Sequence, residues 1–164
     1  MIDITVGQAQ RLTSPNPFGL LTTVKQDGTD NVMAVSWWTY LSNRPPMLGV
    51  CLSKKKLSGS LIEKNGEFVL NIVGESLKDA AKSCGSCSGK DVDKVKEFGI
   101  PLEPASAVGA KLVSGSRVAF ECKLISQADA SDHMFYIAEI VAVHGDSEVP
   151  QVFAWDGFSR VDTI

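Results

Sequence analysis

The sequence predicts a mainly β protein, in which antiparallel strands joined by hairpins form a closed barrel with a few short helices around it. About six segments show the apolar alternation, or the continuous apolar character, that is typical of strands. Residues 26–29 contain Asp-Gly, a strong hairpin signal because both residues tolerate positive φ angles. No long helical pattern separates the strands, so a parallel doubly wound sheet is disfavoured.

Length and composition are those of one ordinary globular domain. The chain has 164 residues, of which 44% are apolar and 21% are charged. We therefore expect residues 1–164 to form a single domain around one core. The net charge of −3 gives no reason to expect nucleic acid or an anionic membrane as a partner.

The chain shows none of the usual signals for export. Residues 1–11 lack the basic start and apolar stretch of a signal peptide, and no apolar run is long enough to cross a bilayer. Cys51 and Cys122 lie within apolar segments, where a reduced thiol behaves as a small apolar side chain. That pattern does not suit a secreted disulfide scaffold. We expect a cytoplasmic protein.

Six stretches are expected to be strands. They are residues 18–25, 31–38, 47–52, 67–73, 118–125 and 133–144. In the fifth, Val118 and Phe120 share a predicted core face, whereas Ala119 and Glu121 share a predicted solvent face. The sixth is almost continuously apolar, so we expect both of its faces to be covered, with His144 at the surface.

The remaining stretches are expected to be short helices and connections. Helices are predicted at residues 59–64, 75–83 and 91–98, a turn-rich loop at 84–89 and an irregular connection at 99–115. In the tail, Phe153, Trp155 and Phe158 stand among polar residues, so we expect them to pack on this core or on a second subunit.

Residues 53–58 form a polar, basic turn that leads into the first predicted helix. Three lysines and Ser58 stand at the start of this helix, where unpaired N–H groups and a partial positive charge favour a phosphate. The alternative is a surface run of lysines with Ser58 as an ordinary N-cap. Both interpretations stay open on the turn alone.

Several reaction classes have no support in the sequence. There is no paired set of carboxylates, no serine–histidine–aspartate set and no Gly-x-Gly-x-x-Gly motif for a dinucleotide. The acidic residues are scattered over presumed solvent faces.

Six short motifs in register carry a resemblance to a known family. They are Asn31-x-Met33-Ala34-x-Ser36-Trp37, Pro45-Pro46, Ser53-x-x-Lys56-x-Ser58, Gly66-Glu67-Phe68-x-x-Asn71-Ile72, Ser88-Gly89-Lys90-Asp91-x-Asp93-Lys94 and Asp132-His133. In this order they resemble the flavin reductase-like proteins, and the flavoredoxins in particular. The resemblance runs from about Pro17 to Val143.

The resemblance implies a homodimer of six-stranded, antiparallel Greek-key split barrels, each with one FMN near the subunit interface. It implies that residues 31–37 lie along the flavin ring, that residues 53–58 cradle the phosphate, and that His133, the candidate catalytic residue, faces the flavin or its ribityl chain. The implied cofactor contacts are Asn31, Met33, Ala34, Val35, Ser36, Trp37, Ser53, Lys54, Lys56, Ser58, Ser88, Gly89, Lys94, His133 and Phe158.

The sequence departs from the family pattern at three places. Lys56 stands where arginine is usual, and lysine lacks the two-pronged geometry that arginine offers a phosphate. Ser131 replaces a glycine that often precedes Asp-His. The pair Cys84 and Cys87 is not part of the pattern, and three interpretations stay open: zinc ligands, a redox pair beside the flavin, or small residues in a tight loop.

Other candidate residues also have structural alternatives. Trp37 and Trp38 should point to opposite faces of a strand, so one of them belongs to the core. His133 can be a structural hydrogen-bonding residue at a strand start, and Lys94, without the resemblance, would be an exposed helix lysine.

The function implied is an FMN-dependent oxidoreductase that takes hydride from NAD(P)H and passes electrons to free flavin, an iron complex or a redox protein. The flavin would supply the chemistry, and the chain would supply orientation, charge and access. The alternatives are an FMN-binding electron carrier without hydride chemistry and a non-catalytic flavin-binding protein.

Overall fold

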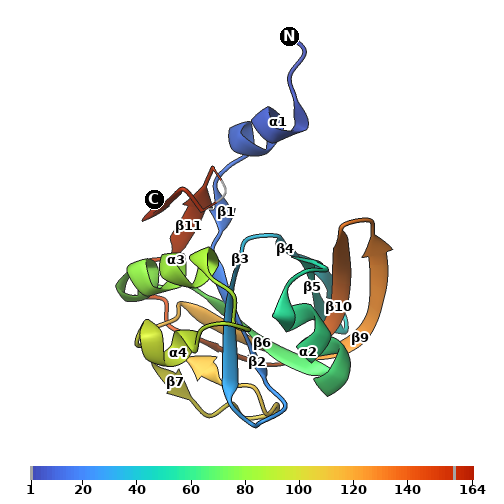
Figure 1. Cartoon of the computed structure of the whole chain (residues 1–164), viewed down its shortest axis with the longest axis vertical. Helices are drawn as coiled ribbons and strands as arrows, with labels where there is room; N and C mark the ends of the chain where they lie inside the picture. Colours follow the sequence, from blue (N-terminus) through green and yellow to red (C-terminus); the bar gives the residue numbers. More distant parts are fainter. Residues whose placement is uncertain (1, 157) are drawn as a thin grey trace.

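A computed structural model describes residues 2–156 and 158–164 and shows a mainly β protein (Figure 1). The strands are β1 (Asn16–Pro17), β2 (Gly19–Val24), β3 (Asp30–Val35), β4 (Trp38–Asn43), β5 (Pro46–Ser53), β6 (Glu67–Ile72), β7 (Leu102–Glu103), β8 (Leu112–Val113), β9 (Val118–Ala130), β10 (His133–Gly145), β11 (Val152–Trp155) and β12 (Arg160–Thr163). The helices are α1 (Val6–Leu12), α2 (Leu57–Asn65), α3 (Lys78–Ser86), α4 (Lys94–Glu97) and the 3₁₀ turn η1 (Glu75–Leu77).

The main sheet has seven antiparallel strands in the order β3-β2-β6-β9-β10-β5-β4. Its two edge strands, β3 and β4, are consecutive in the chain and are joined only by Ser36 and Trp37. Because two residues span so short a distance, the sheet must curl until its edges approach each other. The sheet is therefore a barrel that stays split between β3 and β4, which confirms the split-barrel class and corrects the prediction of a closed barrel.

The main sheet has one strand more than predicted, because one of the expected strands is divided into two strands. Residues 31–38 were expected to be continuous, but the strand ends at Val35 and a new strand starts at Trp38. β4 then pairs with β5 in a stretch where the sequence predicts a loop. This pairing adds a seventh strand to the six that were expected.

The predicted hairpin between the first two long strands is confirmed. β2 and β3 pair antiparallel in the register Val24↔Asp30, and Gly28 in the turn has a φ of 80°. Asp27 Oδ1 accepts hydrogen bonds from the Thr29 amide at 2.9 Å and from its hydroxyl at 2.6 Å. Glycine tolerates this left-handed φ without strain, so the turn fixes the register of the strand that carries Asn31 and Met33.

Two apolar cores lie on opposite faces of the curled sheet. The inner core contains Leu48, Val50, Phe68 and Phe120, and Trp38 packs against it while its Nε1 donates to the Pro17 carbonyl at 3.2 Å. The other core joins the sheet to α3 and to the tail strands; in Figure 1 α3 lies beside β3, and β11 lies beside β1. β3 therefore packs on both faces, with Val35 in the inner core and Val32 and Ala34 in the other core.

The tail aromatics pack mainly on their own chain. The Phe158 ring lies 5.2 Å from that of Phe18, and the Arg160 guanidinium lies 5.0 Å from the Trp155 ring. β11 and β12 form a small sheet with β1 that the sequence did not predict. Short strands such as these carry too little alternation to be recognised.

Glu121 is buried, contrary to the prediction of a solvent-facing side chain. The connection between β7 and β8 folds over this side of the sheet, and its Ser106, Ala107 and Val108 amides donate to the Glu121 carboxylate at 2.5–3.1 Å. His144 Nε2 lies 2.7 Å from Glu121 Oε1. His144 remains exposed, as expected, but it takes part in this network.

The long strands β9 and β10 also differ from expectation. β9 runs to Ala130, and the turn before His133 holds Ser131 at a φ of 63°, a left-handed conformation that favours the glycine of the family pattern. β10 is not covered on both faces, because Val141 and Val143 near its end are exposed.

The three predicted helices are present with different bounds, as α2, as η1 followed by α3, and as α4. α3 continues through Cys84, Gly85 and Ser86, so the predicted turn-rich loop at 84–89 begins only after Ser86. An unexpected helix, α1, stands away from the sheet in Figure 1 and buries none of its residues. None of the helices in residues 2–156 and 158–164 has the length and apolar character needed to span a bilayer.

Candidate functional site

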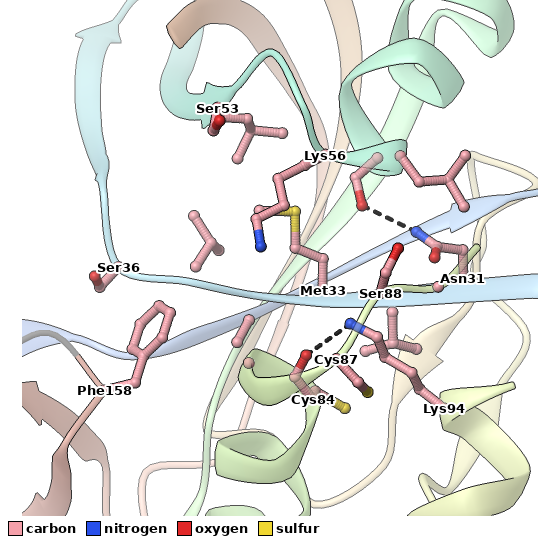
Figure 2. A pocket seen from close by; sticks show the side chains of 18 of the residues that line it. Asn31, Met33, Ser36, Ser53, Lys56, Cys84, Cys87, Ser88, Lys94 and Phe158 are labelled. Atoms are coloured by element: carbon pink, nitrogen blue, oxygen red, sulfur yellow. Dashed lines mark hydrogen bonds between the residues drawn. The ribbon is translucent and has the colours of Figure 1, made fainter. Parts of the chain in front are cut away.

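A pocket of about 280 Å³ opens at the split of the barrel. β3 and the Ser36–Trp37 corner form one wall, the end of β5 and the start of α2 form another, and the end of α3 closes the base (Figure 2). The lining residues are Asn31, Val32, Met33, Ala34, Val35, Ser36, Trp37, Cys51, Leu52, Ser53, Lys56, Leu57, Ser58, Cys84, Gly85, Cys87, Ser88, Gly89, Lys94, His133 and Phe158.

Almost all residues that the resemblance implied lie around this one pocket. Lys54 is the exception, because its Nζ lies 2.5 Å from Asp129 Oδ2 in an exposed ion pair outside the lining. Lys54 directly follows β5 and reaches Asp129 at the end of β9, whereas Lys56 is the N-cap of α2 and lines the pocket. Lys54 is therefore removed from the candidate set.

The start of α2 provides a positive end of the pocket. Lys56 is the N-cap residue and its side chain makes no capping hydrogen bond; Figure 2 shows its nitrogen directed into the pocket. The amides of the first helical turn face the same region and carry the partial positive charge of a helix start. The alternative of Ser58 as an N-cap is wrong, because Ser58 lies inside the helix and its hydroxyl accepts a hydrogen bond from Asn31 Nδ2 at 2.9 Å.

Lys94 adds a second positive charge, and it is buried. Its side chain is 6% exposed, and its Nζ donates to the Cys84 carbonyl at 2.6 Å (Figure 2). Burial lowers the pKa of Lys94. Among the described residues no carboxylate forms an ion pair with it. The exposed helix lysine that the sequence alone suggested is thus a buried cation at the pocket.

Asn31, Thr23 and Ser58 form a buried polar cluster beside these lysines. Asn31 Nδ2 donates to Thr23 Oγ1 at 3.1 Å and to Ser58 Oγ at 2.9 Å. A Cβ atom at Gly89 would collide with Asn31 Oδ1, so only glycine lets this loop approach the strand. The cluster therefore fixes β3, the start of α2 and the Ser88–Gly89 loop relative to one another.

The other end of the pocket is aromatic and apolar. The ring centroids of Trp37 and His133 lie 5.0 Å apart with an interplanar angle of 32°, and Phe158 from the tail also lines the pocket. Trp37 is 45% exposed, so this end is open to solvent. His133 Nδ1 lies 2.9 Å from Asp132 Oδ1, and this contact lowers the pKa of the Asp132 carboxyl.

Several lining residues were not named individually as cofactor contacts in the sequence analysis. They are Val32, Cys51, Leu52, Leu57, Cys84, Gly85 and Cys87. The position of Cys84 and Cys87 next to Ser88-Gly89 indicated that they lie near the site. The extension of α3 through Ser86, which brings them to the pocket, had no such indication in the sequence. Burial raises the pKa of the Cys84 thiol to about 11. Among residues 2–156 and 158–164 there is no cluster of three or more ligand-type side chains that could hold a metal.

The pocket combines two chemical environments. Lysines and helix amides suit a phosphate, whereas backbone along β3 and apolar or aromatic walls suit a planar ring. The pocket can therefore hold a ligand that combines a planar ring with a phosphate.

Comparison with known proteins shows which family the chain belongs to. Residues 11–162 match the model of the flavin reductase like domain. The chain is 30% identical over 151 residues to the Escherichia coli protein YddH, which covers 90% of this chain and 80% of that protein. It is 35% identical over 112 residues to HsaB, the reductase subunit of a flavin-dependent monooxygenase of Mycobacterium tuberculosis, which covers 68% of this chain and 55% of HsaB.

A solved structure shows the same fold. The flavoredoxin of Desulfovibrio vulgaris superposes with a TM-score of 0.87 at 26% identity, covering 99% of this chain and 93% of that one. The chain belongs to the flavin reductase-like family and lies close to the flavoredoxins. It is therefore a flavin-related oxidoreductase or electron carrier.

Proposed function

We propose that this pocket binds FMN and that the protein is an NAD(P)H-dependent flavin oxidoreductase, which passes electrons to free flavin, an iron complex or a redox protein. The observation that carries the proposal is the buried Lys94 beside Lys56 and the start of α2. A buried cation without a carboxylate partner costs free energy unless an anion balances it. A phosphate at this end of the pocket would do so.

The same end of the pocket supports FMN rather than FAD. It offers one compact set of phosphate donors, namely Lys56, Ser58 and the first amides of α2. The sequence contains no dinucleotide motif that would hold an adenosine half.

The residues around the pocket suit defined roles toward a flavin. β3 would hold the ring along its backbone, and the phosphate donors would anchor the opposite end. Trp37 and His133 would border the open face through which a donor or acceptor reaches the ring. Bound flavin supplies hydride and electron chemistry that no side chain here can supply.

The assignment of His133 as the catalytic residue belongs to this proposal. Its Nδ1 contacts Asp132, which leaves Nε2 as the nitrogen available to the pocket. That nitrogen could donate or accept a hydrogen bond at a ligand in the pocket.

A second candidate is an FMN-binding electron carrier that does not use NAD(P)H. The similarity to a flavoredoxin favours it, whereas the similarity to a monooxygenase reductase subunit favours the enzyme. A flavin-binding protein without catalytic activity is the third alternative.

One experiment separates these candidates. Purified protein loaded with FMN is mixed with NADH or NADPH in the absence of oxygen, and the absorbance of oxidised flavin is followed. The proposal predicts bleaching by at least one nucleotide. Bleaching by dithionite but by neither nucleotide would contradict the enzyme and favour the carrier, and failure to bind FMN would contradict both.

A further inference from the structure

Three polar side chains at the positive end of the pocket are almost completely shielded from solvent. Asn31 is 3% exposed, Ser58 is 2% exposed and Thr23 is fully buried. They come from three different elements, β3, α2 and β2. Buried polar groups must satisfy their hydrogen bonds within the protein or with a ligand.

The hydrogen bonds of this cluster can be counted. A side-chain amide has two N–H donors, and Asn31 Nδ2 gives one to Thr23 Oγ1 at 3.1 Å and one to Ser58 Oγ at 2.9 Å. Ser58 Oγ therefore acts as an acceptor toward Asn31, and its own O–H proton must point elsewhere. No group among the described residues accepts that proton.

Ser58 lines the pocket, so its unpaired O–H faces the space that a ligand would fill. The same region holds the Lys56 side chain and the first amides of α2, which all favour an anionic acceptor. A hydroxyl that already accepts a hydrogen bond is a better donor, because hydrogen bonds in a chain polarise one another.

We propose that Asn31 is a positioning residue for phosphate recognition: by donating to Ser58 Oγ, it directs the Ser58 O–H toward the phosphate of the ligand. The inference rests on the proposed function and deepens it, because it explains how the site would distinguish FMN from riboflavin. Asn31 would not touch the phosphate; it would act through Ser58. The amide would thus set a specificity for phosphorylated flavin.

The test is a double-mutant cycle on ligand affinity. The dissociation constants of FMN and riboflavin are measured by fluorescence quenching for the parent, Asn31→Leu, Ser58→Ala and the double variant. We expect Ser58→Ala to weaken FMN binding about 10-fold, and Asn31→Leu about 3- to 10-fold, as for single hydrogen bonds to a charged group. Riboflavin affinity should change less than about 2-fold, and Asn31→Leu should add nothing once Ser58 is alanine.

Two further variants serve as a control and as an independent test of the hydrogen-bond direction. Thr23→Val removes the other acceptor of the Asn31 amide and should leave the ratio of FMN to riboflavin affinity unchanged, whatever it does to the melting temperature. Asn31→Asp keeps the shape but turns the side chain into an acceptor of the Ser58 proton, so FMN should bind more weakly than in Asn31→Leu. This variant also serves if Asn31→Leu does not fold.

Three results would overturn the inference. They are equal losses of FMN and riboflavin affinity in Asn31→Leu, additive effects in the double variant, and parent-like FMN affinity in Asn31→Asp. In all three the parent still binds FMN, so the proposed function would stand. A parent that binds neither ligand would instead contradict the proposed function.

Discussion

At the scale of single residues, Lys94 shows how a site can cost stability. Burial lowers the pKa of this lysine, and among the described residues its ammonium has a backbone carbonyl as partner rather than a carboxylate. In the folded state the charged form is disfavoured, so the charge opposes folding at neutral pH. The burial of Lys94 at the pocket is therefore better explained by a role in binding an anionic ligand than by a contribution to folding stability.

Replacement of Lys94 by methionine tests whether this lysine serves ligand binding at the expense of folding stability. Methionine retains the length and apolar stem of lysine, so Lys94→Met should leave the melting temperature equal or higher while FMN binding weakens about 10-fold or more. Thermal unfolding and FMN titration measure the two effects. Lys90→Met, which changes an exposed lysine in the loop before α4, is the control and should change neither the melting temperature nor FMN affinity by much. A large loss of stability in Lys94→Met with unchanged FMN affinity would assign Lys94 a structural role.

The thiol pair at the base of the pocket is expected to matter little for flavin chemistry. The Cys84 thiol is buried and its pKa is raised to about 11, so very little reactive thiolate forms at neutral pH. Cys84→Ser combined with Cys87→Ser should leave flavin binding and NAD(P)H-driven reduction within about threefold of the parent, because less than about 1 kcal/mol is involved. Stopped-flow reduction of the double variant measures this. A tenfold slower reduction with FMN still bound would instead make the pair part of the mechanism.

At the scale of elements, the connection from β7 to β8 is held by one buried carboxylate. Burial opposes the charge of Glu121, but hydrogen bonds from Ser106, His144 and Ala107 outweigh it and hold the Glu121 pKa at about 2. A lowered pKa means that the folded state favours the charged form. The resulting stability is complete above the unfolded value of 4.5 and is lost as the pH falls toward 2.

Glu121→Gln should remove this pH dependence. The glutamine amide would place N–H groups against the Ala107 and Val108 amides, so we expect a loss on the order of 3 kcal/mol at pH 7 and a smaller loss at pH 3. Urea unfolding at several pH values measures the difference. Glu103→Gln, which changes an exposed acid at the end of β7, is the matched control. Equal losses at pH 7 and pH 3 would show that the charge is not what holds the connection.

The elements also show where sequence reasoning succeeds and fails. The β2–β3 hairpin was predictable because Asp27 and Gly28 encode the turn locally. The burial of Glu121 was not, because it depends on a connection without periodicity that folds over the sheet from residues far along the chain. The end of α3 was misjudged because Gly85 and Ser86 have low helix propensity, which tertiary packing overrides.

The candidate site was predictable to a similar extent. The family motifs indicated Lys56, Ser58 and Lys94, and the structure brings all three to one pocket. Lys54 was included only because it stands in the same turn. The contact between Asn31 and Ser58 joins elements 27 residues apart, and no pattern in the sequence predicts it.

At the scale of the whole molecule, we predict a homodimer. The tail aromatics that first suggested it pack largely on their own chain, but exposed apolar side chains remain at the split, namely Trp37, Tyr40 and Leu41. Tyr40 and Leu41 belong to the edge strand β4, and exposed apolar edges usually mark an interface. Light scattering at micromolar concentration should give twice the chain mass of 17.6 kDa. A monomer with flavin bound would contradict the prediction.

That residues 1–164 form one domain also stays a prediction.

The central claim is that the pocket at the split of the barrel binds FMN. The most direct measurement is the identity of the flavin that copurifies with the protein, released by heat and separated against riboflavin, FMN and FAD standards. We predict that FMN predominates, because the pocket offers one phosphate site formed by Lys56, Ser58 and Lys94. Mainly FAD would contradict the single-phosphate site, and a colourless protein that also fails to take up added FMN would contradict the claim itself.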